Sequence, residues 1–322
     1  MPEKFHDGLR ALQEDMIYKW FNSDKRHKVF CAPTGIGKTL FYIYLARMTN
    51  TPTVILTSTR GLQKQVFREF ESLGLLNIMG KSNYPCTMED EWTCEDGAQA
   101  RCPLVGSPAC SHSNSHMAAV LGNLVVTNDA YWVAVNKYGK GLANNTHLVI
   151  DEAHGSFVIV AKSMQVVLSD NEIVSKLKQD WPVQDDSLSE WKFWALRVKA
   201  HADREVAEWE QKVRTAVTPK ITWLRHIHHM QNLSRRLATL GLIKPEDWIV
   251  ERRDNGWWFD PIKVASYAER VLFRNIPQVT WVSATIQPFN VYSCGVFSKH
   301  FDFFQYDTPW DKSKAPVYYV PT

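Results

Sequence analysis

The segment Ala32-Pro-Thr-Gly-Ile-Gly-Lys-Thr39 is the feature that most constrains how this chain can fold. It follows a β-rich run over residues 27–32 and precedes helical periodicity that begins at about Lys38. A glycine-rich turn between a strand and a helix can wrap backbone N–H groups around phosphate oxygens at the positive end of the helix. The segment therefore predicts a phosphate-binding P-loop in a parallel α/β fold.

Each part of this loop has a predicted role in holding ATP and Mg²⁺. The small residues Gly35 and Gly37 let the backbone approach the phosphates, and Lys38 would neutralise the β- and γ-phosphates. The Thr39 hydroxyl would ligate Mg²⁺. The predicted ATP-binding residues of the loop are Pro33, Thr34, Gly35, Ile36, Gly37, Lys38 and Thr39. The strict pattern fails at its first position, which is Ala32 rather than Gly.

A second motif, Leu148-Val-Ile-Asp-Glu-Ala-His154, adds two carboxylates at the end of an apolar strand. Asp151 can hold Mg²⁺ through water, and Glu152 can orient or deprotonate an attacking water. A lone Asp-Glu pair is commonly a solvated loop, but the P-loop earlier in the chain argues against that interpretation. The two motifs together predict hydrolysis of a nucleoside triphosphate.

Composition excludes several other classes of protein. The 322 residues are 45% hydrophobic and 22% charged, which excludes a disordered, collagen-like or coiled-coil chain and favours about two domains. No apolar run approaches the roughly 18 residues of a spanning helix, and the opening MPEKFHDGLR lacks a signal peptide's apolar stretch. We therefore expect a soluble cytoplasmic chain, nuclear in a eukaryote, with no membrane partner. The net charge of +3 is too small to indicate nucleic acid by itself.

Alternating strands and helices occupy the first half of the chain. Further strands are predicted over Thr53–Thr57, Leu124–Thr127 and Leu148–Ile150. A helix is predicted after the first of these strands, up to about Leu73. This order predicts a parallel sheet with crossover helices. The segment 80–115 is predicted to be irregular.

The character of the sequence changes after about residue 165. A capping box at Ser187-Leu-Ser-Glu190 begins a long helix that reaches about Val217. Two further helices are predicted, one over Ile221–Leu240 with Gly241 as its C-cap and one over about 261–274. Strand character returns at Gln278–Ser283.

Four of the six cysteines lie in the irregular segment, and seven residues separate each from the next. They are Cys86, Cys94, Cys102 and Cys110. In a reducing compartment such a group favours a metal or iron–sulfur site over disulfides, and the close Cys-x-x-Cys pairs of zinc sites are absent. Spacing alone does not choose between zinc and an iron–sulfur cluster. His112 and His116 are alternative zinc ligands or else solvent-facing residues.

Eight of the thirteen tryptophans lie between residues 165 and 275. The helical spacing of Trp191 and Trp194 favours core packing over a binding surface. The pair Trp257-Trp258, next to Arg252 and Arg253, is the candidate nucleic-acid contact of this region.

The order of these motifs resembles a known family. Asp-Glu-Ala-His at 151–154, with Ser283-Ala-Thr285 after a strand, resembles the superfamily 2 helicases, whose P-loop has the form Ala-x-x-Gly-x-Gly-Lys-Thr. Four cysteines between the P-loop and the acidic box, and a helical insert before Ser-Ala-Thr, resemble the iron–sulfur helicases of the XPD/DinG family. The resemblance covers nearly the whole chain but is only architectural within 165–275.

The resemblance implies an α/β fold, a RecA-like P-loop sheet with a cysteine-rich cluster insertion and a mainly helical Arch-like insertion. The predicted motor-domain parts are 1–80, 118–164 and 276–322, and the predicted insertions are 81–117 and 165–275. Too few residues follow Ile286 for a second RecA-like domain, so that domain is expected beyond Thr322 or on another chain. The final Pro-Val-Tyr-Tyr-Val-Pro at 316–321 resembles the connection to it.

The resemblance also implies roles for individual residues. Arg10 and Gln13 match the family's nucleotide-base motif, and the catalytic set becomes Lys38, Asp151, Glu152 and His154. Ser283 and Thr285 would couple hydrolysis to strand movement together with His154. The resemblance favours a [4Fe–4S] cluster on the four cysteines, although Cys110 is followed by Ser111-His112 where the family often has Pro-Tyr.

Contacts to DNA are expected at the ends of two strands whose sequences are similar to further motifs of this family, 56–63 and 124–128. Hydroxyls, a cation and a helix N-terminus suit phosphate oxygens, whereas the acidic cysteine segment does not. The predicted DNA-binding residues are Thr57, Ser58, Thr59, Arg60, Asn128 and Tyr131. Tyr131 and its neighbour Trp132 would stack on bases or pack in the core.

The resulting hypothesis is an ATP-dependent helicase that moves 5′→3′ on single-stranded or fork DNA, with this chain as its N-terminal half-motor. One alternative is an RNA-directed ATPase of the Asp-Glu-Ala-His type, which would hold zinc instead of iron. The other is a non-catalytic module that binds DNA or a partner protein. Because the arginine fingers of such motors come from the second domain, we expect negligible ATPase activity from these 322 residues alone.

Overall fold

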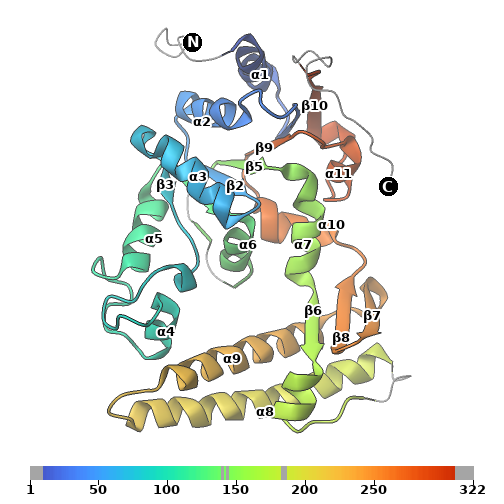
Figure 1. The fold of residues 1–322 in the computed structure, drawn as a ribbon. Coiled ribbons are helices and arrows are strands. Elements are labelled where there is room, and N and C mark those ends of the chain that lie inside the picture. The colour runs from blue at the N-terminus through green and yellow to red at the C-terminus, as the bar shows by residue number, and fades with distance from the viewer. Residues whose placement is uncertain (1–9, 139–140, 143–144, 183–186, 309–322) are drawn as a thin grey trace, which may run out of the picture. The chain divides into compact units, whose positions relative to one another are not determined.

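The computed structural model describes residues 10–138, 141–142, 145–182 and 187–308. These residues form two compact units, which are described separately (Figure 1). Unit 1 spans Met1–Ile78, Ala119–Ile159 and Ala268–Thr322, and unit 2 spans Met79–Ala118 and Val160–Tyr267. The predicted connection at 316–321 lies outside the described residues.

Unit 1 is built on a seven-stranded sheet in the order β10-β1-β9-β5-β2-β4-β3, in which every neighbouring pair is parallel. Its strands are β1 His27–Cys31, β2 Thr53–Thr57, β3 Leu76–Asn77, β4 Leu124–Asn128, β5 His147–Asp151, β9 Gln278–Ser283 and β10 Phe301–Gln305. The predicted α/β class with a parallel sheet is confirmed. The strands β3 and β10 were not predicted, since one is two residues long and the other follows a short helix.

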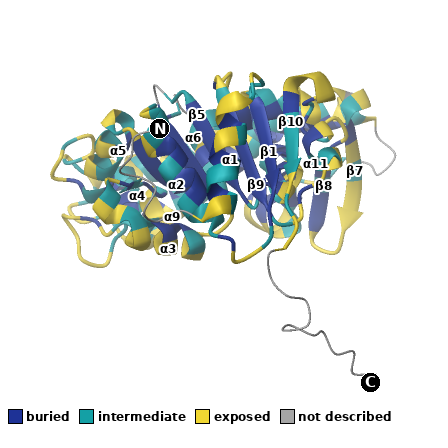
Figure 2. Cartoon of the chain, turned by 90° about the horizontal axis from the view of Figure 1, so that it is seen from above, coloured by how far each residue is buried: buried dark blue, intermediate teal, exposed yellow. Residues whose placement is uncertain are grey.

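Helices cover both faces of this sheet, as a parallel sheet requires. They are α1 Ala11–Asn22, α2 Lys38–Thr49, α3 Arg60–Phe70, α6 Asp129–Tyr138, α7 Ser156–Met164, which runs into unit 2, and α11 Pro288–Tyr292. On one face, Met16 of α1 and Phe41 of α2 share a core with Val282 of β9. On the other face, Phe273 lies against Trp281, with 5.4 Å between ring centroids. The strands in the middle of the sheet are buried along their whole length (Figure 2).

The larger part of unit 2 is an antiparallel pair of long helices, α8 Leu188–Thr215 and α9 Ile221–Leu242. The predicted capping box is confirmed, because Ser187 Oγ accepts from Glu190 N at 3.4 Å and Glu190 Oε2 accepts from Ser187 N at 3.0 Å. The predicted C-cap at Gly241 is wrong, since α9 continues through it. A Cβ at Gly241 would lie 2.9 Å from Leu196 Cδ2, so the glycine allows α8 and α9 to pack closely.

Unit 2 also contains a three-stranded antiparallel sheet that the sequence interpretation missed. Its strands lie in the order β6-β8-β7, where β6 is Val166–Ser169, β7 is Trp248–Arg253 and β8 is Gly256–Pro261. The helix predicted over 261–274 begins only at α10, Ala265–Ala268, and continues as a π-helical turn, Glu269–Phe273. The signal was present in Asp254-Asn255-Gly256, a hairpin turn between two β-rich runs.

The cysteine-bearing segment of unit 2 is more regular than predicted. It contains the short helix α4, Cys94–Gln99, and leads into α5, Ser111–Leu121, which ends in unit 1. Thr93 caps α4, since its Oγ1 accepts from Asp96 N at 3.3 Å and the Asp96 carboxylate accepts from Thr93 N at 2.9 Å.

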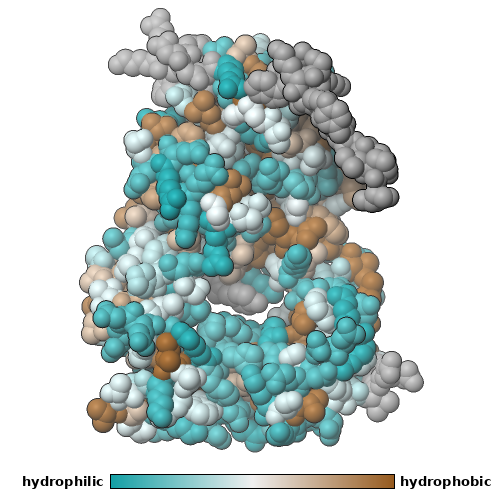
Figure 3. Space-filling model, viewed as in Figure 1, coloured by the Kyte–Doolittle hydropathy of each residue, from teal (hydrophilic) through white to brown (hydrophobic). Residues whose placement is uncertain are grey.

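The hydrophilic character of the visible surface is consistent with apolar side chains being packed inside each unit. The face visible in the space-filling view is mostly hydrophilic, with hydrophobic side chains in scattered groups (Figure 3). Among the described residues, no helix combines the length and the apolar character that crossing a bilayer requires.

Candidate functional site

The register of the parallel sheet brings the predicted nucleotide motifs of unit 1 together. Strand β9 lies between β1 and β5, and it pairs Ser283 with Cys31 and Val282 with Asp151. The P-loop after β1, the acidic box after β5 and Ser283 therefore all lie at the carboxyl edge of the sheet. Ligands of open α/β sheets bind at this edge.

The P-loop has the backbone of a phosphate-binding turn. Gly35 and Gly37 have φ angles of 79° and 83°, in the left-handed region that glycine adopts without steric cost. Helix α2 begins at Lys38, and in this structure Lys38 Nζ donates to the Pro33 carbonyl at 3.2 Å. Lys38 and Thr39 are half-buried, and both lie at the positive end of α2.

Helix α1 holds this loop in place through the two residues assigned to the nucleotide base. Gln13 Nε2 donates to the carbonyls of Ile36 at 2.9 Å and Gly37 at 3.0 Å, and Arg10 Nη1 donates to Gly35 O at 3.1 Å. Gln13 is 1% exposed. A Cβ at Gly37 would lie 2.2 Å from Gln13 Nε2, so the glycine also makes room for this contact. In this structure Gln13 therefore contacts the loop backbone, which sequence reasoning did not foresee.

The acidic box presents a buried carboxylate beside the P-loop. Asp151 is 8% exposed, accepts from Tyr42 Oη at 3.3 Å and accepts from the backbone N–H of Glu152 at 3.1 Å. Burial and repulsion from Glu152 raise the pKa of Asp151 to about 6, while the positive charge of Lys38 acts in the opposite direction. A cation at this position would favour the ionised carboxylate. Tyr42 was missed, although it lies one helical turn after Thr39.

Glu152 and the residues assigned to coupling form one hydrogen-bonded group. His154 Nδ1 lies 2.8 Å from Ser283 Oγ, and Ser283 Oγ donates to Glu152 Oε2 at 3.3 Å. His154 Nδ1 also lies 3.4 Å from Glu152 Oε2, so the three side chains contact one another. Thr285 N also donates to Ser283 Oγ, at 3.2 Å. Glu152 has a φ of 50°, a strained conformation for a residue with a side chain, and it sits next to Asp151.

The structure corrects part of the predicted DNA contact. Thr57 and Asn128 pair with each other across β2 and β4, and both side chains are buried. Thr57 Oγ1 donates to Thr127 O at 3.4 Å, and Asn128 Nδ2 donates to Gln63 Oε1 at 2.7 Å. Their polar atoms are thus used inside the unit, which makes them supporting residues here.

Three consecutive residues at the start of α3 are exposed. They are Ser58, Thr59 and Arg60, and the Thr59 hydroxyl also caps α3 by accepting from Leu62 N at 3.2 Å. Their exposure at a helix N-terminus suits phosphate oxygens.

The aromatic residues considered for contact with nucleic acid differ in how far they are buried. Tyr131 is half-buried, and its backbone N–H donates to Asn128 Oδ1 at 2.9 Å. Trp132 is 1% exposed and donates from Nε1 to Leu272 O at 2.8 Å, so it belongs to the core and the stacking role is wrong for it. Trp257 is also buried, with its ring centroid 4.7 Å from that of Trp191.

The two arginines beside Trp257 are occupied by ion pairs. Arg252 pairs with Asp170 at 2.8 Å, and Arg253 pairs with Glu251 at 2.6 Å and with Asp260 at 3.2 Å. Trp257 therefore belongs to the core, whereas Trp258 is half-buried with the Arg253 guanidinium 4.2 Å from its ring centroid. A contact of Trp258 and the two exposed arginines with nucleic acid stays a prediction.

The four predicted cysteines of unit 2 line one small cavity. They are Cys86, Cys94, Cys102 and Cys110, joined there by Gly97 and the apolar Leu104 and Val105. Cys94 Sγ and Cys110 Sγ are 3.6 Å apart, and a Cβ at Gly97 would lie 2.8 Å from Cys86 Sγ. Among the described residues, no group of three or more His, Cys, Asp or Glu is spaced to hold a single metal ion.

The two histidines considered as zinc ligands do not line the cysteine cavity. The ring of His112 instead packs edge-on against Tyr84, with 5.3 Å between centroids, and stacks on His116 at 6.1 Å. The donor set that converges on the cavity is thus four thiols, which is the ligand set of an iron–sulfur cluster or a Cys₄ zinc site.

The cysteine segment packs on the long helices within unit 2. The Asp96 carboxylate, in the first turn of α4, forms an ion pair of 3.3 Å with Arg225 of α9. Gln99 Nε2 donates to Gln231 Oε1 at 2.9 Å, and Trp92 packs against a small core of Val213, Leu224 and Ile227. Sequence reasoning did not predict these contacts, because no spacing rule connects segments so far apart in the chain.

Comparisons with known proteins agree with this geometry. A family profile described as DEAD/DEAH box helicase matches residues 10–170. No curated protein sequence matches the chain.

Solved structures of XPD helicases share the fold. One titled XPD helicase superposes with a TM-score of 0.66 at 15% identity, covering 92% of this chain and 62% of that one. A truncated XPD superposes with a TM-score of 0.61 at 15% identity, and the match covers 93% of this chain and 100% of that one. An XPD in the apo form gives a TM-score of 0.52 at 13% identity, and the match covers 92% of this chain and 57% of that one. The chain thus spans about three fifths of the first of these structures, and the predicted RecA-like fold is confirmed.

Proposed function

The chain belongs to the DEAD/DEAH box helicase family, and on that premise we propose that it is the ATP-binding half of an ATP-dependent DNA helicase motor. The observation that carries this proposal is the meeting of three strand ends at one edge of the sheet. The P-loop after β1, the acidic box after β5 and Ser283 of β9 lie on three adjacent strands, which supports one shared nucleotide site.

The residues at this edge divide the work of holding and cleaving MgATP. Backbone N–H groups of the P-loop would bind phosphate oxygens, with Lys38 at the β- and γ-phosphates. Thr39 and Asp151 would hold Mg²⁺, whose charge would keep Asp151 ionised despite its burial. Glu152 would orient and deprotonate the attacking water.

The hydrogen bonds of Ser283 offer a route from hydrolysis to movement. Ser283 contacts both Glu152 and His154, so a change at the catalytic carboxylate alters contacts of the segment that follows β9. Thr285 is tied to the same hydroxyl through its backbone N–H. We assign this group to coupling because its members come from β5 and β9, the two strands that carry the acidic box and Ser-Ala-Thr.

Single-stranded or fork DNA is the proposed track. Ser58, Thr59 and Arg60 would contact its phosphates at the N-terminus of α3. Tyr131, in α6 after β4, would also contact the DNA. The 5′→3′ direction follows from the resemblance to the XPD/DinG family. A second RecA-like domain, supplied beyond Thr322 or by another chain, would complete the motor and bring the arginine fingers.

The four cysteines of unit 2 would hold a [4Fe–4S] cluster. Four thiols around one cavity with an apolar lining suit such a group, and a cluster would supply a structural link between distant parts of the segment. Zinc is the alternative ligand. Iron and sulfide analysis of the purified chain, with its visible absorption, decides between them, since a zinc protein is colourless.

Titration calorimetry of the 322-residue chain with MgATP tests the proposal. We expect binding to the wild-type chain and at least a hundredfold weaker binding to Lys38→Ala, because the β- and γ-phosphates lose their cation. Lys244→Ala, an exposed lysine of unit 2, is the matched control and should bind as the wild type does. Equal affinity of wild type and Lys38→Ala would overturn the assignment.

Turnover measurements separate the proposed half-motor from the RNA-directed ATPase. The chain alone should hydrolyse ATP negligibly, with or without single-stranded DNA. Robust turnover stimulated by DNA would contradict the need for a second domain. Stimulation by RNA but not by DNA would instead favour the RNA-directed ATPase.

A further inference from the structure

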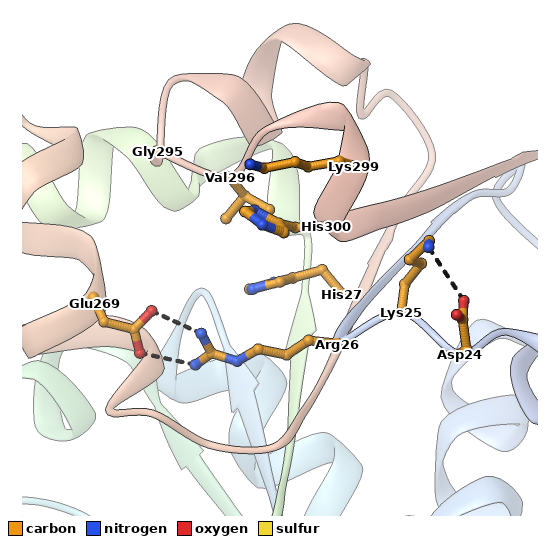
Figure 4. Close-up of a pocket in the computed structure, with 9 residues that line it drawn as sticks. All are labelled: Asp24, Lys25, Arg26, His27, Glu269, Gly295, Val296, Lys299 and His300. Atoms are coloured by element: carbon orange, nitrogen blue, oxygen red, sulfur yellow. Dashed lines mark hydrogen bonds and ion pairs between the residues drawn. The ribbon is translucent and has the colours of Figure 1, made fainter.

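A second cavity of unit 1 lies at the edge of the sheet opposite to the P-loop. It has a volume of about 560 Å³ and opens where β1 and β10 begin, at the paired residues His27 and Phe301 (Figure 4). Basic side chains dominate its lining, which includes Lys25, Arg26, Lys299 and His300. Nucleotide binding at the carboxyl edge of the sheet leaves this cavity unexplained.

The two acidic residues of the lining are already neutralised by neighbours. Glu269 accepts both terminal nitrogens of Arg26 at 2.8 Å and also accepts from Asn275 N at 2.6 Å. Asp24 forms an ion pair of 3.3 Å with Lys25. The acids therefore cancel Arg26 and Lys25 and leave the remaining basic groups of the cavity uncompensated.

Those remaining groups are Lys299 and His300, in the short 3₁₀ turn Ser298–His300 before β10. Both are exposed, and neither side chain has an ion-pair partner among the residues that the structure describes. Figure 4 shows their side chains pointing the same way as that of His27, so these three groups line one wall, beside the Arg26–Glu269 pair. Such a wall attracts an anion.

His27 adds a hydrogen-bond donor to this wall. It is 2% exposed, and its Nδ1 accepts from Trp281 Nε1 at 3.1 Å, which places the proton of the neutral ring on Nε2. Burial, followed by the positive charge of Arg26, lowers the pKa of His27 to about 3, so the ring is neutral near pH 7. Trp281 uses only Nδ1, so the protonated Nε2 of this buried imidazole suits an oxygen atom of a ligand.

We propose that this cavity binds the diphosphate group of a small molecule through Lys299, His300 and His27. The volume falls within the range of ligand pockets and exceeds what a single ion fills. Among the described residues that line it there is no Phe, Tyr or Trp, and Val296 is the one aliphatic side chain. Charge and hydrogen bonds rather than base stacking therefore select the ligand. Inorganic pyrophosphate and the diphosphate of a nucleotide share this chemistry.

Titration calorimetry with inorganic pyrophosphate tests the site in a Lys38→Ala background, in which the P-loop has lost its phosphate-binding cation. We expect one binding event per chain and at least tenfold weaker affinity when Lys299→Glu is added, because a cation is replaced by an anion. His300→Gln should weaken binding severalfold. Thermal unfolding of each variant shows whether the chain remains folded.

Lys244→Glu is the matched control, since it makes the same charge change at an exposed lysine of unit 2. Its affinity for pyrophosphate should equal that of the background chain. Equal weakening by Lys299→Glu and Lys244→Glu would overturn the site, as would the absence of any binding in the Lys38→Ala background. Failure of this cavity site is distinguishable from failure of the ATP site. The ATP site is tested by Lys38→Ala alone, with the cavity residues unchanged.

ADP and a single-stranded DNA oligonucleotide distinguish the sources of the ligand. ADP binding equal to that of pyrophosphate supports recognition of the diphosphate alone, and tighter ADP binding that Lys299→Glu still weakens supports a nucleotide diphosphate. Binding of the oligonucleotide without any binding of pyrophosphate would contradict the proposal, because it would identify an extended phosphodiester chain as the ligand.

Discussion

The nucleotide site of unit 1 and the cysteine cavity of unit 2 are assembled in different ways. The first depends on strand register, since β9 pairs with β1 and with β5 and thereby fixes Ser283 beside both motifs. The second depends on a segment with a short helix, α4, and turns, in which the backbone N–H of each of the four cysteines donates to a carbonyl of the same segment at 2.8–3.2 Å. One site is set by the strands of a buried sheet, and the other by a short helix and the turns around it.

These two kinds of assembly indicate which site can exist without its ligand. The P-loop keeps its shape through hydrogen bonds from Gln13, which is buried in the core of unit 1. The four thiols gather around their cavity with little secondary structure to hold them. We therefore expect the nucleotide site to be preformed and the cysteine segment to depend on the group that it binds.

Replacement of a cysteine should have the largest effect. Cys102→Ser removes one of four thiolates, and we expect loss of bound iron and of visible absorption together with lower thermal stability of unit 2. The affinity for MgATP should stay within about twofold of wild type. Cys294→Ser, at a buried cysteine of unit 1, is the control and should keep the iron.

Two results would contradict this independence of the two sites. If Cys102→Ser abolished MgATP binding along with iron, the two sites would not be independent. If Cys294→Ser also lost its iron, the cysteine segment would respond to damage anywhere in the chain.

Removal of the buried charge at Asp151 should have the next largest effect. Its pKa is raised from 3.8 to about 6, so the folded chain binds an extra proton in that window and loses stability as pH rises through it. Asp151→Asn should therefore stabilise the nucleotide-free chain by up to about 3 kcal/mol above pH 6. Urea unfolding at pH 4 and pH 7.5 measures this, and a gain that is equal at both pH values would contradict the argument.

Deletion of one hydroxyl in the nucleotide site should have an intermediate effect. Ser283→Ala removes hydrogen bonds to Glu152, His154 and Thr285 N, and we expect a loss of about 1–2 kcal/mol of unfolding free energy. Ser156→Ala is a well-matched control, since its buried Oγ has no hydrogen-bond partner among the described residues. Equal costs in urea unfolding would show that these bonds contribute nothing beyond packing.

Loss of the ion pair between the cysteine segment and α9 should have the smallest effect. Arg225→Ala removes the contact with Asp96, but Arg225 is 62% exposed, so we expect a cost of about 0.5 kcal/mol. Arg214→Ala, which removes the exposed pair with Glu210 on α8, is the control. A cost several times larger for Arg225→Ala alone would show that this contact holds the cysteine segment in place.

Sequence reasoning predicted the parts of the fold in which local pattern and tertiary structure agree. The P-loop, the strands of the sheet centre and the capping box at Ser187 each have a short-range signal, and all three are present. The sheet of unit 2 was missed because tryptophans at 257 and 258 were weighed as surface residues and not as a strand. Gly241 was misassigned because a glycine near a helix end has two possible causes, capping and close packing against Leu196.

The candidate site was predictable in composition and less so in geometry. Motifs named the residues of the nucleotide site except Tyr42. They did not predict the burial of Thr57 and Asn128, since side chains at strand ends can point inward as well as outward. The contacts of Gln13 with the P-loop depend on how α1 packs, which no motif encodes. Long-range packing therefore decides which motif residues reach the ligand.

Hydrogen–deuterium exchange on addition of MgATP tests most directly whether three strand ends form one nucleotide site. Slower exchange is predicted at 33–39, at 151–154 and at 283–285, with no change in the cysteine segment 79–118. The Lys38→Ala chain should show none of these changes. Protection of the P-loop alone, with 151–154 and 283–285 unaffected, would contradict the claim that the sheet register assembles a single site.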